Sequence, residues 1–171
     1  MRKVFQVIEQ LKQEGVIDEY AVAGAVGAIF YVEAFNTQDV DLLVNLPMSL
    51  DPLSSIRKRL EEMGYSFNNE GHIVIDSWPV QFLPVSDGLT AEALQEAQYL
   101  PFDEELLVRV ARPEHLAAEA LKVGRPKDFQ RVSMLVECDE FDSDYFQEVI
   151  RRFSLEDKWQ KMQSVFDGGL K

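Results

Sequence analysis

Apolar positions in the first part of the chain alternate between helical and strand-like patterns. Residues 4–11 place apolar side chains at helical spacing, which predicts an amphipathic helix that ends near Gly15. The short, mostly apolar segments 20–23 and 40–45 predict strands, the first of them buried. The segment 25–34, which is apolar except for Glu33, predicts a buried helix. The chain therefore opens with a helix followed by a strand–helix–strand unit.

The middle of the chain is rich in strand patterns. An amphipathic helix over 53–63, closed by Gly64, precedes them. The predicted strands cover 65–67, 72–75, 80–83 and 106–110, with turns at 68–71 and 76–79 and a helix over 90–98.

After Pro113 the pattern is purely helical, with apolar faces over 116–121, 132–136, 145–150 and 159–166. No repeat and no flexible linker interrupts the chain. We therefore expect an α/β (α+β) core over residues 1–111, with a mixed sheet flanked by helices. A helical C-terminal part, 112–171, is expected to pack on that core.

Composition supports a folded domain and restricts its partners. Hydrophobic residues make up 46% of the 171 residues, and the net charge is −13. Such a chain repels polyphosphate backbones at long range, so bulk DNA binding is not expected. A small anionic ligand remains compatible, because a bound cation masks local carboxylates. The segment 122–131 is locally basic, whereas 137–148 is acidic.

The expected compartment is the cytoplasm. Cys138 is the only cysteine and cannot form an internal disulfide. Polar residues interrupt the first apolar stretch, and no apolar run is long enough to span a bilayer. The acidic residues around Cys138 disfavour its thiolate, which argues against a nucleophilic role.

The chemically informative residues lie around the first two strands. Gly24 ends the first strand and opens a helix, where exposed amides can bind a phosphate. Asp39 and Asp41 are separated by Val40, so both carboxylates point to the same side of the second strand. Mg²⁺ binds one or two such carboxylates and completes its shell with water and phosphate oxygens.

Together these residues give a resemblance to a known superfamily. A glycine turn in Val22-Ala23-Gly24-Ala25-Val26-Gly27 and the Asp-Val-Asp of 39–41 resemble the nucleotidyltransferase superfamily with the polymerase-β-like fold. A second block, 113–128, resembles the lysine helix and Arg-x-Lys-Asp turn of its minimal bacterial branch. That branch includes the abortive-infection (AbiEii) type toxin nucleotidyltransferases. The matching blocks lie between residues 21 and 135.

The resemblance implies a site residue by residue. Asp39 and Asp41 would bind Mg²⁺ or Mn²⁺ against the triphosphate of an NTP substrate, and Lys122 would steady phosphate charge. Gln81 stands where the family has a third acid, which activates the acceptor hydroxyl. The expected nucleotide-binding residues are Gly24, Ala25, Thr37, Lys122 and Arg125. The acceptor is left open between a protein, an RNA end and a small molecule.

Departures from the family pattern keep other functions open. Gln81 cannot act as a carboxylate base, Ala25 removes a possible phosphate-binding hydroxyl, and Phe35 stands where an arginine is common. One alternative is a catalytically silent nucleotide-binding module of the same fold. Another is a protein-interaction module, either an antitoxin-like partner of a basic protein or a homodimer. Lys122 also has a purely structural alternative at its helix end.

Overall fold

The computed structural model describes residues 1–33, 37–46, 52–68 and 72–168. In chain order its elements are α1 (Arg2–Gln13), β1 (Glu19–Val22), α2 (Gly24–Ala28), β2 (Val40–Asn45), α3 (Pro52–Glu62), β3 (Ser66–Phe67), β4 (Ile73–Ile75), β5 (Trp78–Pro84), α4 (Gly88–Gln95), β6 (Gln98–Pro101), β7 (Leu107–Val110), α5 (Pro113–Val123), α6 (Pro126–Leu135), α7 (Ser143–Arg152) and α8 (Glu156–Gly168). Ala34, Phe35, the turn residues 69–71 and the side chain of Phe166 lie outside this description.

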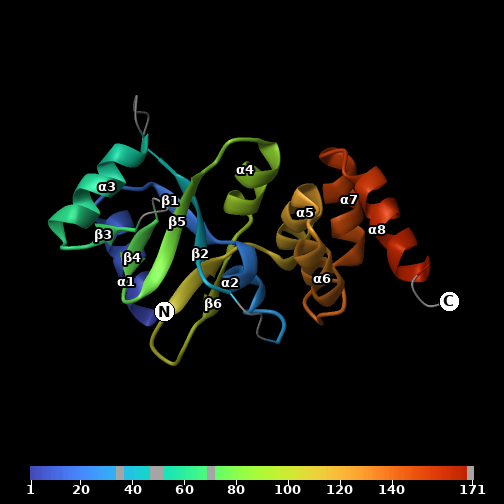
Figure 1. Cartoon of the computed structure of the whole chain (residues 1–171), viewed down its shortest axis with the longest axis horizontal. Helices are drawn as coiled ribbons and strands as arrows, with labels where there is room; N and C mark the ends of the chain where they lie inside the picture. The colour runs from blue at the N-terminus through green and yellow to red at the C-terminus, as the bar shows by residue number, and fades with distance from the viewer. Residues whose placement is uncertain (34–36, 47–51, 69–71, 169–171) are drawn as a thin grey trace.

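The described strands form one seven-stranded sheet in the order β3-β4-β5-β2-β1-β7-β6 (Figure 1). β2 runs parallel to β5, and β1 runs parallel to β7. The other neighbouring strands are antiparallel. Strands β1 and β2 therefore occupy the middle of the sheet, in agreement with the burial predicted for β1. The predicted mixed α/β fold is confirmed.

Two hydrophobic clusters cover the two faces of the sheet. One includes apolar residues of α1 and α3, and the other includes residues of α4 and the C-terminal helices. Along β2, Leu42 and Val44 belong to the first cluster and Leu43 to the second. Since side chains alternate along a strand, Asp41 points to the same face as Leu43, toward the C-terminal helices.

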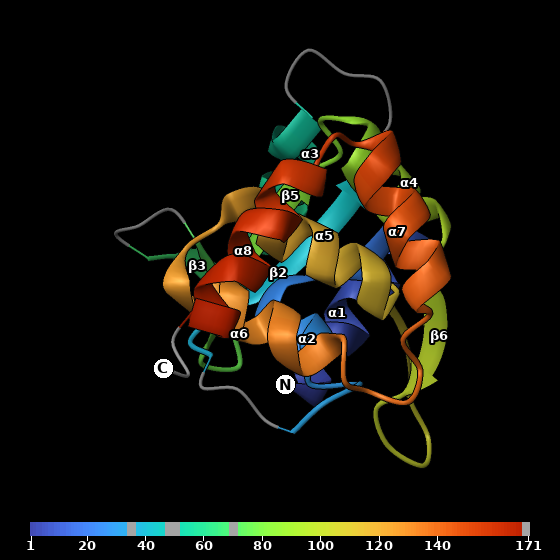
Figure 2. The ribbon, with the colours of Figure 1, turned by 90° about the vertical axis from the view of Figure 1, so that its right-hand side faces the viewer.

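The C-terminal helices α5 to α8 lie together on one side of the sheet, with α5 and α6 nearer to the strands than α7 and α8 (Figures 1 and 2). Helix α5 is buried along most of its length, and Leu116, Ala117 and Leu121 share a cluster with Ala21 and Leu43 of the central strands. Helix α5 also contacts α2 and α4. The packing of a separate C-terminal part on the core stays a prediction. The boundary between residues 111 and 112 stays a prediction.

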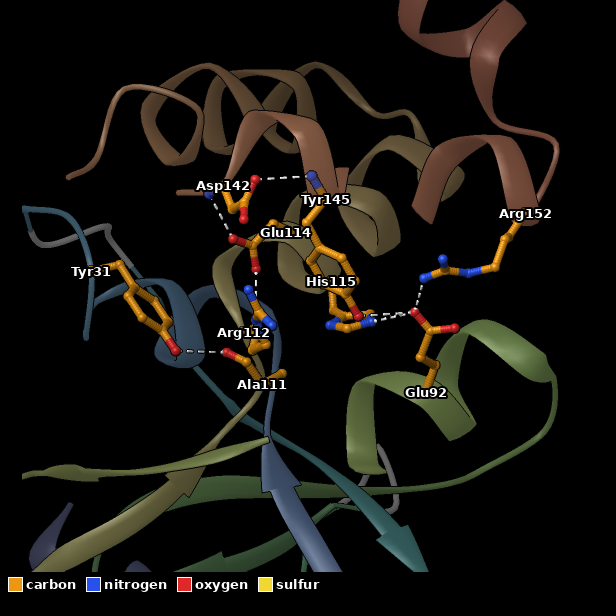
Figure 3. A network of polar contacts seen from close by, with 9 residues as sticks. All are labelled: Tyr31, Glu92, Ala111, Arg112, Glu114, His115, Asp142, Tyr145 and Arg152. Carbon is orange, nitrogen blue, oxygen red and sulfur yellow. Dashed lines mark hydrogen bonds and ion pairs between the residues drawn. The ribbon is translucent and has the colours of Figure 1, made fainter. Parts of the chain in front are cut away.

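A buried polar network fixes α5 to α7 (Figure 3). The side chain of Glu114 is fully buried, and its carboxylate accepts hydrogen bonds from Arg112 Nε at 3.1 Å and Asp142 N at 2.7 Å. Asp142 in turn begins α7, accepting a hydrogen bond from Tyr145 N at 2.9 Å. A buried carboxylate needs such partners, because an unpaired buried charge is strongly destabilising.

The same network reaches α4 through Glu92. His115 Nε2 and Tyr145 Oη lie 3.1 and 3.2 Å from Glu92 Oε1, and Arg152 forms an ion pair with that oxygen (Figure 3). Burial lowers the pKa of His115, while the hydrogen bond to Glu92 opposes this. His115 therefore has a structural position among the helices.

Several predicted boundaries differ from the structure. The helix predicted over 25–34 is the short α2, which ends at Ala28 and continues as turns. The turn predicted over 76–79 is shorter, because Asp76 and Ser77 both adopt positive φ (49° and 68°) and β5 already begins at Trp78. Two central residues with φ > 0 produce the tight hairpin that matches strand twist.

The segment before β7 also differs from the prediction. The helix predicted over 90–98 is α4, which starts earlier because Asp87 caps it and accepts a hydrogen bond from Thr90 N at 3.0 Å. Gln98 belongs instead to β6, an edge strand that the pattern did not predict. An edge strand lacks clean alternation when both faces are partly exposed, and Tyr99 is 49% exposed.

A lipid-spanning element was not expected. Across the four described ranges, no helix combines the length and apolar character that crossing a bilayer requires.

Candidate functional site

The turn after β1 brings the backbone against Asp41. Gly24 has φ of +59°, in the left-handed region, and a Cβ built there would lie 2.1 Å from Asp41 Oδ2. Ala23 N also donates a hydrogen bond to the Asp41 carbonyl at 2.9 Å. Only glycine satisfies both the backbone conformation and the close contact. The predicted strand-to-helix turn beside the aspartates is therefore present.

The two aspartates line one cleft of about 590 Å³. Asp41 is the second residue of β2, and Asp39 precedes the strand by one residue. Because Asp39 lies in a bend before the strand, the alternation of strand side chains does not by itself place it on the side of Asp41. Thr37 Oγ1 donates a hydrogen bond to the Asp39 carbonyl at 3.0 Å and lies 3.5 Å from its Oδ1. The Thr37 hydroxyl thus orders the segment that carries Asp39.

Gln81 reaches the same cleft from the neighbouring strand. In the parallel pairing of β2 with β5, Asp41 is the register partner of Gln81. Register partners on adjacent strands point to the same face, so both side chains line the cleft. The predicted placement of Gln81 beside the aspartates is confirmed, while its role in a reaction stays a prediction.

Helix α6 forms the opposite, basic wall. Arg125, Lys127 and Arg131 line the cleft from this helix and its N-cap. The buried Asp128 positions them: its carboxylate accepts hydrogen bonds from Arg125 Nε at 2.6 Å and Arg125 N at 3.1 Å. Arg131 lies 3.8 Å from the other oxygen of Asp128. Although burial opposes it, the contact with Arg125 lowers the pKa of Asp128, which stays ionised.

The charges on the two walls of the cleft affect the pKa values of Asp41 and Arg131. Burial raises the pKa of Asp41, and the charge of Asp39 raises it further, while Arg131 and Arg125 oppose the shift. Burial lowers the pKa of Arg131, whose side chain is only 14% exposed. A guanidinium nevertheless stays charged in proteins. The cleft therefore offers paired negative charge on the sheet and fixed positive charge on α6.

Lys122 does not line this cleft. Its ammonium group pairs with Asp87 at the start of α4, and both residues line a separate, small cavity with Phe153 and Leu155. The lysine assigned by resemblance to steady phosphate charge thus lies apart from Asp39 and Asp41 in this structure. Arg125, Lys127 and Arg131 are the cations that line the cleft together with the aspartates.

Asp39 and Asp41 are the cleft residues that could hold a hard divalent cation. Among the described residues no group of three or more acidic, histidine or cysteine side chains forms a metal cage. Mg²⁺ does not need such a cage, because one or two carboxylates suffice when phosphate oxygens and water complete its shell.

Five cleft residues were not assigned to the site from sequence: Gln38, Lys127, Gln130, Arg131 and Met134. The available signal was the locally basic segment 122–131, inside a chain of net charge −13. Residues 127, 130, 131 and 134 are three to four apart, so they fall on one face of α6. The sequence did not show that this face turns toward the aspartates.

Comparisons with known proteins identify the fold. No family model matches the chain, and no curated protein matches it. Two solved structures are similar: an antigenic nucleotidyltransferase-like protein from Paracoccidioides brasiliensis and the antibiotic-resistance factor ANT(2'')-Ia. The first has a TM-score of 0.53 at 12% identity, covering 94% of this chain and 90% of that one. The second has a TM-score of 0.52 at 12% identity, covering 94% of each.

These likenesses concern the fold, because the sequence identities are low. They support the predicted nucleotidyltransferase-like fold. Membership of the abortive-infection branch stays a prediction. The described residues thus form a mixed sheet flanked by helices, with the nucleotidyltransferase-like fold.

Proposed function

We propose that this protein transfers a nucleoside monophosphate from an Mg²⁺-bound NTP to a hydroxyl acceptor. The observation that carries the proposal is the single cleft in which Asp39 and Asp41 face Arg125 and Arg131. A metal-bound triphosphate requires carboxylates that bind the cation and, opposite them, guanidinium groups that bind the phosphate oxygens. The nucleotidyltransferase-like fold supports the same reading.

Each residue has a definite task in this proposal. The carboxylates of Asp39 and Asp41 would hold Mg²⁺ or Mn²⁺, which when bound neutralises charge on the phosphate oxygens. Arg125 and Arg131 would bind phosphate oxygens from α6, with their orientation set by Asp128. Gly24 leaves room for the Asp41 carboxylate at the turn. Catalysis would come mainly from positioning and charge stabilisation.

The transfer itself exchanges one phosphoester bond for another. The acceptor hydroxyl oxygen attacks the α-phosphorus, the bond to the pyrophosphate oxygen breaks, and pyrophosphate leaves. The hydroxyl proton passes to water, because the amide of Gln81 can accept a hydrogen bond but is not a base. A missing general base typically costs about 10²–10⁴ in rate. We therefore propose slow turnover.

Gln81 also favours a second candidate function. A module that binds Mg²⁺-NTP without turnover would keep Asp39, Asp41 and the basic wall, and would lose only the third acid. Such a module would act through a protein partner, as in the toxin–antitoxin pairing that the abortive-infection resemblance implies. The two candidates differ in whether pyrophosphate is released.

The first test is nucleotide binding, measured by calorimetry with and without Mg²⁺. We expect Mg²⁺-dependent binding that the double variant Asp39→Asn/Asp41→Asn abolishes. The matched control is Asp139→Asn/Asp157→Asn, which changes the net charge equally at two exposed positions. Equal affinity of wild type and the cleft variant would refute the proposed site.

The second test separates enzyme from silent module. Incubation with an NTP labelled at the α-phosphate, under single-turnover conditions, should yield pyrophosphate and a labelled acceptor. Binding without pyrophosphate release in any acceptor mixture would favour the silent module.

A further inference from the structure

The wall that α6 contributes to the aspartate cleft changes in charge along the helix. Its three cations, Arg125, Lys127 and Arg131, are the N-cap residue, the second residue and the sixth residue of α6. The structure describes the whole of α6, and the last turn of this helix contains no basic residue. There the cleft is lined by Met134. The wall is therefore cationic at the N-terminal end of α6 and uncharged at its C-terminal end.

Gln130 and Met134 are the uncharged side chains of this wall. They are four residues apart, so they lie one above the other on the same face of the helix, and both line the cleft. Gln130 is exposed and Met134 is half-buried. The amide of Gln130 can donate and accept hydrogen bonds, and the thioether of Met134 packs well on aromatic rings. The binding of a cation and phosphates leaves both groups without a role.

The cleft has room for an elongated ligand with two different ends. Between Lys127 and Met134 the helix rises by about 10 Å, at about 1.5 Å per residue. The cleft volume of about 590 Å³ falls within the range of roughly 300–1,000 Å³ that is common for small-molecule sites. A nucleoside triphosphate carries its negative charge at one end and an uncharged aromatic base at the other. Its two ends therefore match the two ends of the wall.

The cationic end is held in place by a buried group. The carboxylate of Asp128 lies 2.6 Å from Arg125 Nε and 3.8 Å from Arg131 Nη1. Phosphate oxygens form strong, charge-assisted hydrogen bonds with guanidinium groups, and the N-terminal end of a helix favours an anion. A nucleotide in the reverse direction would place its base among the cations and its outermost phosphates at Met134. The charges therefore favour one direction of the nucleotide.

We propose that Gln130 and Met134 form the subsite for the nucleobase, with the triphosphate directed toward Arg125 and Lys127. The inference rests on the proposed function and adds base recognition to it. The Met134 thioether would contact the face of the base, and the Gln130 amide would bond to its edge. Every base has an aromatic face, whereas the donors and acceptors on the edges differ between bases. Met134 would therefore add affinity for any NTP, and Gln130 would discriminate between NTPs.

The first test compares Mg²⁺-NTP with Mg²⁺-tripolyphosphate, which lacks base and sugar, by calorimetry on the full chain. The double variant Gln130→Ala/Met134→Ala should bind NTPs at least about fivefold more weakly and tripolyphosphate as wild type does. Unchanged tripolyphosphate binding also shows that the variant has folded. The matched control is Gln147→Ala/Met63→Ala, at an exposed residue of α7 and a half-buried residue on the other face of the sheet. It should bind both ligands as wild type does.

The direction of the nucleotide is tested at the cationic end. Lys127→Gln should weaken the binding of NTPs and of tripolyphosphate by a similar factor, because both ligands place phosphates there. Lys161→Gln removes the same charge at an exposed position of α8 and is the control. The opposite pattern would overturn the proposal: Lys127→Gln would weaken only NTP binding, and the double variant would weaken the binding of both ligands.

Base recognition is tested by titrating wild type and each single variant with ATP, GTP, CTP and UTP in the presence of Mg²⁺. Wild type should prefer at least one of them by about threefold or more, and Gln130→Ala should narrow that spread. Met134→Ala should weaken the binding of all of them by a similar factor. Equal affinities in wild type, or a spread that Gln130→Ala leaves unchanged, would overturn recognition by Gln130.

These measurements also separate the base subsite from the proposed function. Wild type that binds Mg²⁺-NTP no more tightly than Mg²⁺-tripolyphosphate would overturn the subsite and leave the proposed cation–phosphate site standing. A double variant with the NTP affinity of wild type would do the same. Wild type that binds neither ligand would refute the proposed function, and the base subsite with it.

Discussion

Replacing Gly24 with alanine tests the contact on which the site is built. Alanine at φ of +59° costs about 1–2 kcal/mol, because its Cβ crowds the following carbonyl. The new Cβ would also lie 2.1 Å from Asp41 Oδ2, so the aspartate must leave its rotamer, at a further cost of about 0.5–1.5 kcal/mol. We therefore expect Gly24→Ala to lower the free energy of unfolding by about 2–3 kcal/mol.

Gly15 provides a matched control, because its φ is +69° and a Cβ there meets no atom within 4 Å. Gly15→Ala should therefore cost only the backbone component. Both substitutions reduce the entropy of the unfolded chain equally, so the difference between them isolates the contact with Asp41. Urea unfolding at neutral pH measures both, and calorimetry should show that only Gly24→Ala weakens Mg²⁺-NTP binding.

A double-mutant cycle completes the test. In an Asp41→Ala background, a Cβ added at position 24 no longer meets a carboxylate. Gly24→Ala should therefore lower the free energy of unfolding by about 1 kcal/mol less than it does in wild type. Equal destabilisation by Gly24→Ala and Gly15→Ala, together with additive double-mutant energies, would refute the close contact between the turn and Asp41.

Three further predictions follow from the cleft and the helical layer. Burial raises the pKa of Asp41, so its charged carboxylate lowers the stability of the protein as the pH rises above the ordinary aspartate pKa of about 4. Asp41→Asn should therefore unfold at a higher denaturant concentration than wild type at pH 8. The same gain in stability at pH 3 would contradict this explanation. Gln81→Glu should raise single-turnover transfer, by up to about 10²–10⁴, whereas Gln81→Ala should not; equal rates for both would remove Gln81 from the reaction. Glu114→Ala, at the buried carboxylate, should cost about 3–5 kcal/mol in urea unfolding, against about 0.5 kcal/mol or less for the exposed Glu137→Ala; similar losses would argue against the network in Figure 3.

The central strands and the acidic half of the cleft could be predicted because their signals are local. The mostly apolar segments of β1 and β2 predict strands, and the spacing of Asp39 and Asp41 predicts that they share one side; both line the cleft. The resemblance also aligned Gln81 with the neighbouring strand, where register with Asp41 confirms its position.

The basic half depended on tertiary packing. The orientation of α6 is set by α5, which packs on the sheet through residues distant in sequence. Lys122 and Arg131 both lie in the locally basic segment, yet only Arg131 reaches the cleft. The pairing of Lys122 with Asp87 depends on where α4 packs, and no local pattern encodes that. Strand β6 was missed for a similar reason, since its partner β7, rather than its own alternation, makes it a strand.

The order of the two halves along the chain has a consequence for synthesis. Every described strand, with the glycine turn and both aspartates, precedes α5, whereas the arginines of the opposite wall follow it. Chains tend to fold from the N-terminal side while they are being made. A nascent chain that has completed its sheet therefore carries the two carboxylates without their basic counterpart. By this reasoning the nucleotide cannot act as a template for the early sheet. Ligand binding becomes available only after α6 has joined the layer, so it reports a chain whose C-terminal helices have folded.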